Sequence, residues 1–503
     1  MYGTVIEFEL KFQVDPRYRK PLEAAVARGR SQRTRLRAHY FDTADGALAA
    51  AHVVLRLRRE GNAWVQTAKA PSDGPLQRHE HNVEIPTERA SDQPVPSALR
   101  HAGTPVGDRI DRALRKAGHD AAHAELVPLY GTDVWRTTRE MRTGDALLEL
   151  AFDRGEVQAG ERSHPVRELE IELKRGSPQA LLELARRWRN RYGLWLDTVS
   201  KSQRAQQLSR GAAHGEPVHA AAPQFDGEPG GEELFRAVLN SCLTQILPNA
   251  SEVAAGSPDA EHVHQLRIGI RRLRTALREM AAFAPGLDPS CEPVLADTFR
   301  ALGRQRDRER LLQIVQPLVE AAGGPSITWP EPPDGMALEA REVVRAAPFQ
   351  NALMGLIEAA LPPAAPSAQH GSPVRKLLRE RLSKLHRQVV RDGRRFEALS
   401  ALEQHRVRKR LKRLRYLGEF VAPLFGQRKA RRYLEDLHPA QDALGNHNDN
   451  AVAIAAYRDA AAQDGRAWFA AGWLAARQPA SAQACGEALA KIAQARRFWT
   501  GKD

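Results

Sequence analysis

The stretch Val5-Ile-Glu-Phe-Glu-Leu-Lys-Phe12 alternates apolar and charged residues without interruption. Successive side chains of a β-strand point to opposite faces, so this period of two predicts a strand with one apolar face and one charged face. The charged face carries Glu7, Glu9 and Lys11. Such a strand belongs in an antiparallel sheet whose apolar face covers a core.

The same charged face recurs in later segments of the first two hundred residues. These segments are Leu55–Arg58, Trp64–Lys69, Arg78–Ile85, Leu147–Asp153 and Arg167–Lys174. Any one of them fits an ordinary half-exposed sheet whose polar face meets water. Together they segregate charge, because carboxylates gather on some strands and guanidinium groups on others. Carboxylates two residues apart can share a hard cation such as Mg²⁺ or Mn²⁺, and Arg binds phosphate oxygens in bidentate fashion. The pattern therefore predicts a site for a metal bound to a polyanion.

The composition points to the same class of ligand. The 503 residues include 75 Lys and Arg against 61 Asp and Glu, a net charge of +14, which excludes an acidic disordered chain. Aromatic residues make up only 6%, so phosphate recognition is favoured over base stacking and a nucleic-acid partner is not expected. Nothing in the sequence indicates an oligomeric state.

The cysteines and the absence of apolar runs predict the compartment. Cys242, Cys291 and Cys485 lie far apart and form no C-x-x-C motif, which argues against a disulfide framework or a zinc ribbon. No signal peptide and no apolar run of roughly 18 to 20 residues is visible. We therefore expect a cytoplasmic protein that does not contact a membrane.

The N-terminal part resembles a known family. Glu7-Phe-Glu-Leu-Lys11 is similar to the E-x-E-x-K signature of the CYTH superfamily, the triphosphate tunnel metalloenzymes. Further matching segments follow in order: His39–Thr43, Leu55–Gly61, Gln66–Lys69, Glu168–Lys174 and Ser200–Arg204. The resemblance covers residues 1 to about 206. It implies a closed, eight-stranded antiparallel β-barrel with a charged interior.

By this resemblance the N-terminal part is an inorganic triphosphatase, a hydrolase of phosphoanhydride bonds that uses Mg²⁺ or Mn²⁺. The implied metal ligands are Glu7, Glu9, Glu149, Glu170 and Glu172, with Asp153 as an alternative to Glu149. The implied substrate-binding residues are Lys11, Arg56, Arg58, Lys69, Arg136, Lys174 and Lys201. The catalytic group is either a water activated by the cation, with Glu170 as a ligand, or a base formed by Tyr40 with Lys69. His79 and His81 lie where relatives often carry carboxylates, and we expect them to face solvent.

The C-terminal part predicts helices and contains a repeated motif. The first copy is His264–Arg274 (HQLRIGIRRLR) and the second is His405–Arg415 (HRVRKRLKRLR). An aspartate follows each histidine, Asp307 after 43 residues and Asp449 after 44. The two copies lie 141 residues apart at the histidine (405 − 264) and 142 apart at the aspartate (449 − 307), and such self-similarity indicates an internal duplication. We expect the two aspartates to be helix caps or ion-pair partners rather than catalysts.

On a helix of about 100° per residue, the histidine and the basic residues of each motif form one stripe, opposite the leucines. Between positions 401 and 420, seven Lys and Arg meet only two glutamates, so the usual balance of charge on a solvated helix face is missing. This part resembles the CHAD domain, an all-helical domain with internal twofold similarity that binds inorganic polyphosphate. The implied polyphosphate-binding residues are His264, Arg267, Arg271, Arg274, Lys376, Arg379, His405, Arg408, Lys409, Lys412, Arg415 and Tyr416.

The predicted fold class is therefore multidomain α+β. A CYTH-like domain at 1–206 precedes a Gly-, Pro- and Ala-rich linker at 207–224 and a CHAD-like domain at 225–503, with repeats at about 225–360 and 373–503. The alternative to a polyphosphate-binding triphosphatase is a non-catalytic protein bound to polyphosphate granules. A third interpretation is a CYTH enzyme for another triphosphate, such as thiamine triphosphate or a nucleotide.

Overall fold

The computed structural model describes residues 5–60, 63–71, 77–86, 93–284, 286–329, 339–362 and 372–500. The chain folds into two compact units. The sheet unit comprises Met1–Val218 together with Ile246–His262 and Val344–Glu358. The helical unit comprises His219–Gln245, Val263–Val343 and Ala359–Asp503. Two helical segments from the C-terminal part therefore pack with the N-terminal part.

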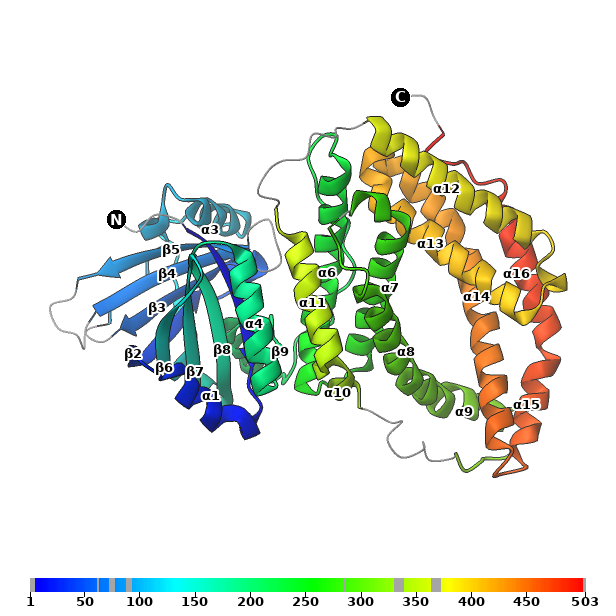
Figure 1. The fold of residues 1–503 in the computed structure, drawn as a ribbon, viewed down its shortest axis with the longest axis horizontal. Helices are drawn as coiled ribbons and strands as arrows, with labels where there is room; N and C mark the ends of the chain where they lie inside the picture. Colours follow the sequence, from blue (N-terminus) through cyan, green and yellow to red (C-terminus); the bar gives the residue numbers. More distant parts are fainter. Residues whose placement is uncertain are drawn as a thin grey trace. The chain divides into compact units, whose positions relative to one another are not determined.

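Antiparallel strands form the body of the sheet unit (Figure 1). They are β1 (Val5–Gln13), β2 (Ser31–Asp42), β3 (Val54–Glu60), β4 (Ala63–Pro71), β5 (Gln77–Ile85), β6 (Val127–Thr143), β7 (Ala146–Ala159), β8 (Arg162–Arg175) and β9 (Trp195–Leu196). Two-residue turns join β6 to β7 and β7 to β8, and each turn begins with a glycine at positive φ, Gly144 at 60° and Gly160 at 59°. This geometry matches the twist of a tight hairpin.

The order of the sheet is β5-β4-β3-β2-β6-β7-β8-β1-β9. The β5 strand also pairs with β1, where Val5–Phe8 lies against Gln77–Glu80, so β1 has three neighbours, β5, β8 and β9. The prediction of eight strands is wrong in number. The ninth, β9, is a two-residue strand whose Leu196 and Trp195 pair with Phe12 and Gln13 of β1.

On β3 and β8 the curved sheet carries charged side chains on its inner face and apolar side chains on its outer face, whereas Leu36 and Ala38 of β2 face inward. The helices of this part are α1 (Arg19–Val26), α2 (Ala47–Ala50), α3 (Pro105–Lys116), α4 (Pro178–Tyr192) and α5 (Lys201–Ser209). α2 and α3 pack on β3 and β4 through Leu55, Leu57, Ile110 and Leu114. Inside, α5 packs against β6, β7 and β8. Burial of the apolar outer face stabilises the sheet and leaves its charged inner face free for a ligand.

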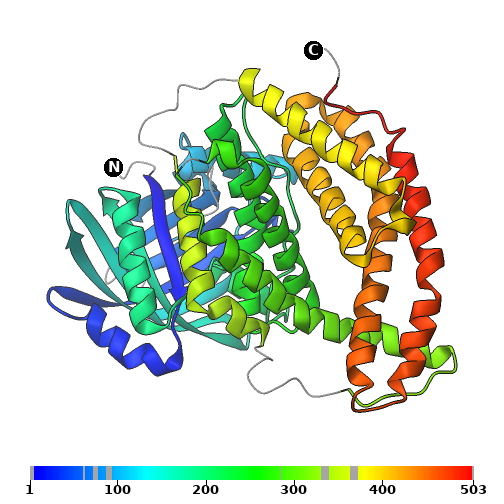
Figure 2. The ribbon, with the colours of Figure 1, turned by 45° about the vertical axis from the view of Figure 1, so that its right-hand side comes forward.

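From Lys201 onward, every regular element of the described residues is a helix. These are α6 (Gly231–Ala255), α7 (Ala260–Glu279), α8 (Cys291–Arg310), α9 (Gln316–Ala321), α10 (Ala340–Arg345), α11 (Ala347–Ala360), α12 (Ser372–Gly393), α13 (Ala401–Phe425), α14 (Gln427–Ala460), α15 (Ala467–Ala476) and α16 (Gln478–Ile492). In the helical unit α12 packs on α13, while α14 packs on α13, α15 and α16 (Figure 2). No helix in the described ranges is both long and apolar enough to cross a bilayer.

Candidate functional site

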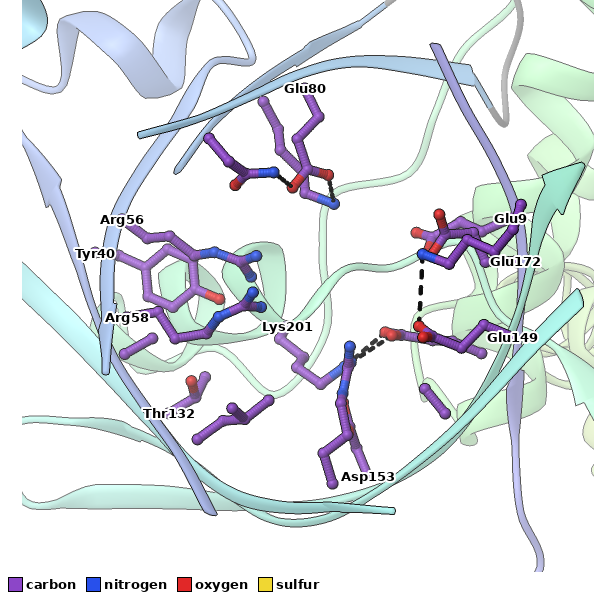
Figure 3. A pocket seen from close by; sticks show the side chains of 18 of the residues that line it. Glu9, Tyr40, Arg56, Arg58, Glu80, Thr132, Glu149, Asp153, Glu172 and Lys201 are labelled. Carbon is purple, nitrogen blue, oxygen red and sulfur yellow. Dashed lines mark hydrogen bonds and ion pairs between the residues drawn. The ribbon is translucent and has the colours of Figure 1, made fainter. Parts of the chain in front are cut away.

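The inner face of the sheet encloses a polar pocket of about 470 Å³, which we call the inner pocket (Figure 3). Its lining residues come from β1 to β8 and from the start of α5: Glu9, Leu36, Ala38, Tyr40, Arg56, Arg58, Lys69, Glu80, Asn82, Thr132, Arg136, Glu149, Ala151, Asp153, Glu170, Glu172, Leu173, Lys174 and Lys201. A smaller pocket of about 120 Å³ shares Glu9, Tyr40, Arg56, Lys69, Glu170 and Lys201 with it and adds Lys11. Strand alternation thus brings together the predicted residues whose side chains the structure describes.

One wall of the inner pocket is basic. Arg56 and Arg58 of β3 project into the pocket beside Tyr40 of β2 (Figure 3), and Tyr40 lies directly opposite Arg56 in the strand register. Burial lowers the pKa of Arg58 to about 10, and the neighbouring guanidinium of Arg56 adds to this effect. The Nε atom of Arg56 is buried and has no hydrogen-bond partner among the described residues. This wall therefore offers positive charge and an unused donor to an anion.

The facing wall is acidic. Glu9, Glu172 and Glu149 lie directly opposite one another across β1, β8 and β7. Lys174 pairs with Glu172 at 2.8 Å and lies 3.7 Å from Glu149. Burial raises the pKa of Glu9, and the nearby carboxylate of Glu170 raises it further. Like charges directly opposite in a sheet repel, so this row favours the arrival of a cation.

A buried ion-pair network separates the two walls. The Nζ atom of Lys201 lies 2.8 Å from Asp153, 2.7 Å from Glu168 and 2.8 Å from Glu170. Arg136 binds Asp153 through two hydrogen bonds of 2.7 Å and also pairs with Glu170. Burial lowers the pKa of Lys201, but these carboxylates raise it well above its usual value. Lys201 and Arg136 are therefore fixed in place before any ligand binds.

The other predicted cations of the sheet unit also have acidic partners. Lys69 pairs with Glu80, which lies opposite it on β5. Lys11 lies 3.8 Å from Glu168 and 3.9 Å from Asp197. The sequence analysis missed Glu80 and Asp197 as members of this network. The predicted ligand Glu7 lies in β1, but its side chain is outside the described residues.

The strand β5 also corrects the interpretation of its two histidines. Glu80 and Asn82 face the inner pocket, so His79 and His81, which alternate with them along β5, face away from it. His81 does not simply meet solvent, because its Nδ1 lies 2.9 Å from Nδ1 of His101, which is fully buried. Burial and the neighbouring His81 lower the pKa of His101 to about 4. The structure thus gives these histidines no place in the inner pocket.

In the helical unit the predicted basic stripe on α7 lies close to the predicted basic stripe on α13. We call the two stripes together the basic cluster. Arg413 of α13 pairs with Glu279 of α7 at 3.0 Å. Burial and Arg271 of α7 lower the pKa of Arg408 on α13. Burial likewise lowers the pKa of Lys409, as do Arg274 and other nearby cations. The two helices therefore place positive charges against one another.

Among the cations of the basic cluster, Lys412 on α13 has the pKa that is lowered most. Its burial and the guanidinium groups of Arg271 and Arg408 lower its pKa to about 6, and the carboxylate of Asp449 only partly offsets them. Asp449 also pairs with Arg310 at 3.1 Å, which confirms its expected role as an ion-pair partner.

The remaining predicted polyphosphate ligands have varied surroundings. The guanidinium groups of Arg267 and Arg271 lie 4.9 and 5.0 Å from the ring centre of Phe299. His405 lies 3.0 Å from Asn448, and Arg415 pairs with Glu419 at 2.6 Å. The structure places His264 on α7, buries Tyr416, and puts Lys376 and Arg379 on α12 rather than on α7 or α13.

Comparison with known families assigns both parts of the chain. The CYTH domain family matches residues 5–205, and the CHAD domain family matches residues 237–458. The chain therefore belongs to the CYTH family in its N-terminal part and to the CHAD family in its C-terminal part. This confirms the resemblances found in the sequence.

The chain is also similar to individual proteins. The inorganic triphosphatase of Haemophilus influenzae is 26% identical over 208 residues, which are 40% of this chain and 54% of that protein. The chain thus matches about half the length of this curated relative. The crystal structure of the CHAD domain from the plant Ricinus communis is 28% identical and covers 55% of this chain and 96% of its own, with a TM-score of 0.45.

Proposed function

We propose that the inner pocket hydrolyses inorganic triphosphate with the help of Mg²⁺ or Mn²⁺. The observation that carries this proposal is the separation of charge across one pocket. Arg56 and Arg58 line one wall, and the carboxylate row Glu9, Glu172 and Glu149 lines the other. A phosphate chain lying between them would bind guanidinium groups on one side and share a cation with carboxylates on the other. The CYTH family membership and the triphosphatase relative support the same substrate.

The acidic wall fits a hard divalent cation. Carboxylate oxygens are the ligands that Mg²⁺ and Mn²⁺ prefer, and burial together with the nearby carboxylate of Glu170 raises the pKa of Glu9. Among the described residues no group of three or more His, Cys, Asp or Glu side chains is arranged as a metal site in advance. Mg²⁺ often takes only one or two carboxylates and completes its shell with water and phosphate oxygens. Glu9, Glu149 and Glu172 would hold the ion, with Glu170 beside them, and the ion would neutralise charge on the phosphate chain.

The protein's own groups would bind and orient the substrate. Arg56, Arg58 and Lys69 would hold phosphate oxygens, while Lys201 and Arg136 keep Glu170 ionised and in place. Phosphoryl transfer depends mainly on positioning and on neutralising charge, which these contacts supply. The hydroxyl of Tyr40 projects into the same pocket, and a base formed by Tyr40 with Lys69 is the alternative proton acceptor.

A phosphate-release assay tests this function. The full chain should hydrolyse triphosphate with Mg²⁺ or Mn²⁺. It should hydrolyse thiamine triphosphate, ATP or long polyphosphate much more slowly. Glu9→Gln should reduce kcat/KM by about 100-fold or more, because it removes a charge that faces the bound cation. Tyr40→Phe separates the two mechanisms: a rate close to that of the wild type assigns activation of the water to the cation. Hydrolysis of triphosphate that survives Glu9→Gln would contradict the proposal.

We also infer that the helical unit binds inorganic polyphosphate through the basic cluster. The lowered pKa of Lys412 supports this inference, because burial and the guanidinium groups of Arg271 and Arg408 outweigh the carboxylate of Asp449 there. The two motifs lie on separate long helices, α7 and α13, and Asp307 and Asp449 lie on α8 and α14, as a duplicated domain would place them. The boundary at 207–224 stays a prediction.

A further inference from the structure

The segment between α4 and α5 determines where Lys201 lies in the inner pocket. Lys201 is the first residue of α5, so its position depends on the backbone from Trp195 to Ser200. On one side this segment is tied to β1: the backbone N–H of Asp197 donates to the carbonyl of Lys11 at 2.9 Å. The carboxylate of Asp197 accepts a 2.7 Å hydrogen bond from Gln13 and also binds Arg204.

The other edge of the same segment is held by side chains from two later helices. The N–H of Leu196 donates to Oε1 of Gln350 on α11 at 2.8 Å, and the N–H of Thr198 donates to Oγ of Ser251 on α6 at 3.0 Å. Alternate N–H groups on the edge of a strand normally donate to the next strand. Here Gln350 and Ser251 take the place of that strand.

Both acceptors are themselves fixed. Gln350 is 2% exposed, and its Nε2 donates to the carbonyl of Val344 at 2.7 Å, so its oxygen is directed to Leu196. Ser251 is 3% exposed, and its hydroxyl donates to the carbonyl of Leu247 at 2.9 Å, which leaves the oxygen lone pairs for Thr198. The two acceptors are therefore preorganised for the segment that they bind.

A third contact to the segment comes from α10. The guanidinium of Arg345 lies 3.8 Å from the ring centre of Trp195, and its Nε donates to the carbonyl of Ala254 on α6 at 2.9 Å. Ser251, Arg345 and Gln350 all belong to the sheet unit. All three nevertheless lie beyond residue 205, where the match to the CYTH family ends, and within the region that matches the CHAD family.

We propose that Ser251 and Gln350 are positioning residues for Lys201 in the inner pocket. By fixing the backbone at Leu196 and Thr198, they set where α5 begins, so that Lys201 reaches Asp153, Glu168 and Glu170 together. This inference rests on the proposed triphosphatase function. Neither residue lines the pocket, so each acts only through the Trp195–Ser200 segment. Displacement of a positioned group by about 1 Å can cost up to about 100-fold in rate.

A double-mutant cycle on the full chain tests the proposal. Gln350→Met and Ser251→Ala should each lower kcat/KM for triphosphate by about tenfold. When Lys201 is already replaced by Met, the same substitutions should have less than a twofold effect, because they act through Lys201. The matched controls are Gln316→Met and Ser241→Ala, which remove a buried Gln and a buried Ser of the helical unit. Both controls should leave kcat/KM within twofold. Additive losses, or equal losses in the controls, would overturn the proposal.

A conservative variant and hydrogen exchange separate positioning from general damage. Gln350→Glu keeps an oxygen for Leu196 and, with its buried carboxyl protonated, a donor for Val344, so it should recover most of the activity lost in Gln350→Met. In EDTA, triphosphate should slow amide exchange across residues 195–209 in the wild type and in both controls, but not in Gln350→Met or Ser251→Ala. This second measurement needs no turnover. If triphosphate protects the wild type but is not hydrolysed, the proposed function is refuted and the positioning role is kept. If triphosphate is hydrolysed and Gln350→Met and Ser251→Ala behave like the wild type, the positioning role is refuted and the proposed function is kept.

Discussion

The inner pocket and the basic cluster both gather positive charge, but they balance it in opposite ways. In the pocket Lys201 contacts three carboxylates, which raise its pKa well above the usual value despite its burial. In the cluster Lys412 is surrounded by guanidinium groups, and its pKa falls to about 6. Charges that are held in place before a ligand arrives suit chemistry that depends on geometry. Charges that repel one another until a polyanion arrives suit binding.

The largest effect should come from the basic wall of the pocket. Arg56→Ala combined with Arg58→Ala removes the groups that face the phosphate chain and should lower kcat/KM for triphosphate by about 100-fold or more. Phosphate release measures this loss, while polyphosphate affinity should stay within twofold. The matched control is Arg33→Ala with Arg37→Ala, two exposed arginines of the neighbouring strand β2 that do not line the pocket. A parallel loss of polyphosphate binding would contradict the division into two sites.

The complementary change is made in the basic cluster. Arg271→Ala combined with Arg408→Ala should weaken polyphosphate binding by about tenfold to 100-fold at low salt and reduce its salt dependence, because fewer counter-ions are released. Hydrolysis of triphosphate should stay within twofold of the wild type. Arg428→Ala with Arg432→Ala removes two exposed cations of α14 as a control. Equal losses in both pairs would mean that only net charge matters.

The sequence could predict the pocket where a strand has one apolar face. Leu55 and Leu57 are buried on the outer face of β3, which leaves Arg56 and Arg58 inside, as the alternation predicted. The strand β5 has polar residues on both faces, so its period of two did not show that Glu80 points inward. That orientation follows from the register with β4, which depends on contacts distant in sequence.

The positioning contacts were beyond prediction for a related reason. Ser251 and Gln350 are a serine and a glutamine in helical sequence, with no motif around them. Their importance comes only from the backbone N–H groups of Leu196 and Thr198 that they meet, more than fifty residues earlier in the chain. Side chains of this kind acquire a role through tertiary packing, which local patterns do not encode.

The pH dependence of polyphosphate binding should report the repulsion around Lys412. Its surroundings are Arg271 on α7, Arg408 and Arg415 on α13, and Asp449 on α14. With a pKa of about 6 in the free protein, Lys412 is mostly neutral at pH 7, and a bound polyanion favours its charged form. Binding should therefore take up a proton, and affinity should rise by up to about tenfold for each pH unit from 8 down to 6, then level off.

Calorimetry in two buffers with different ionisation enthalpies measures this proton uptake. Lys412→Arg is the matched control, because its guanidinium stays charged throughout this range and should give a flatter pH profile. Identical pH profiles for the wild type and Lys412→Arg would show that another group accounts for the dependence.

The smallest effect should be on stability, and its sign should differ between the two sites. Lys412 is easier to protonate in the unfolded chain, so it destabilises the fold below its unfolded pKa, and the cost grows as the pH falls towards 6. Lys412→Met should raise the free energy of unfolding of the helical unit by about 1 kcal/mol. Lys201→Met should instead lower the free energy of unfolding of the sheet unit, because the buried carboxylates of Asp153 and Glu168 would lose the cation that pairs with them. Urea unfolding followed by hydrogen exchange in α13 and α5 measures the stability of each unit separately. A loss of stability in both variants would contradict the difference between the two sites. It would mean that the charges of the basic cluster are already balanced in the absence of a polyanion.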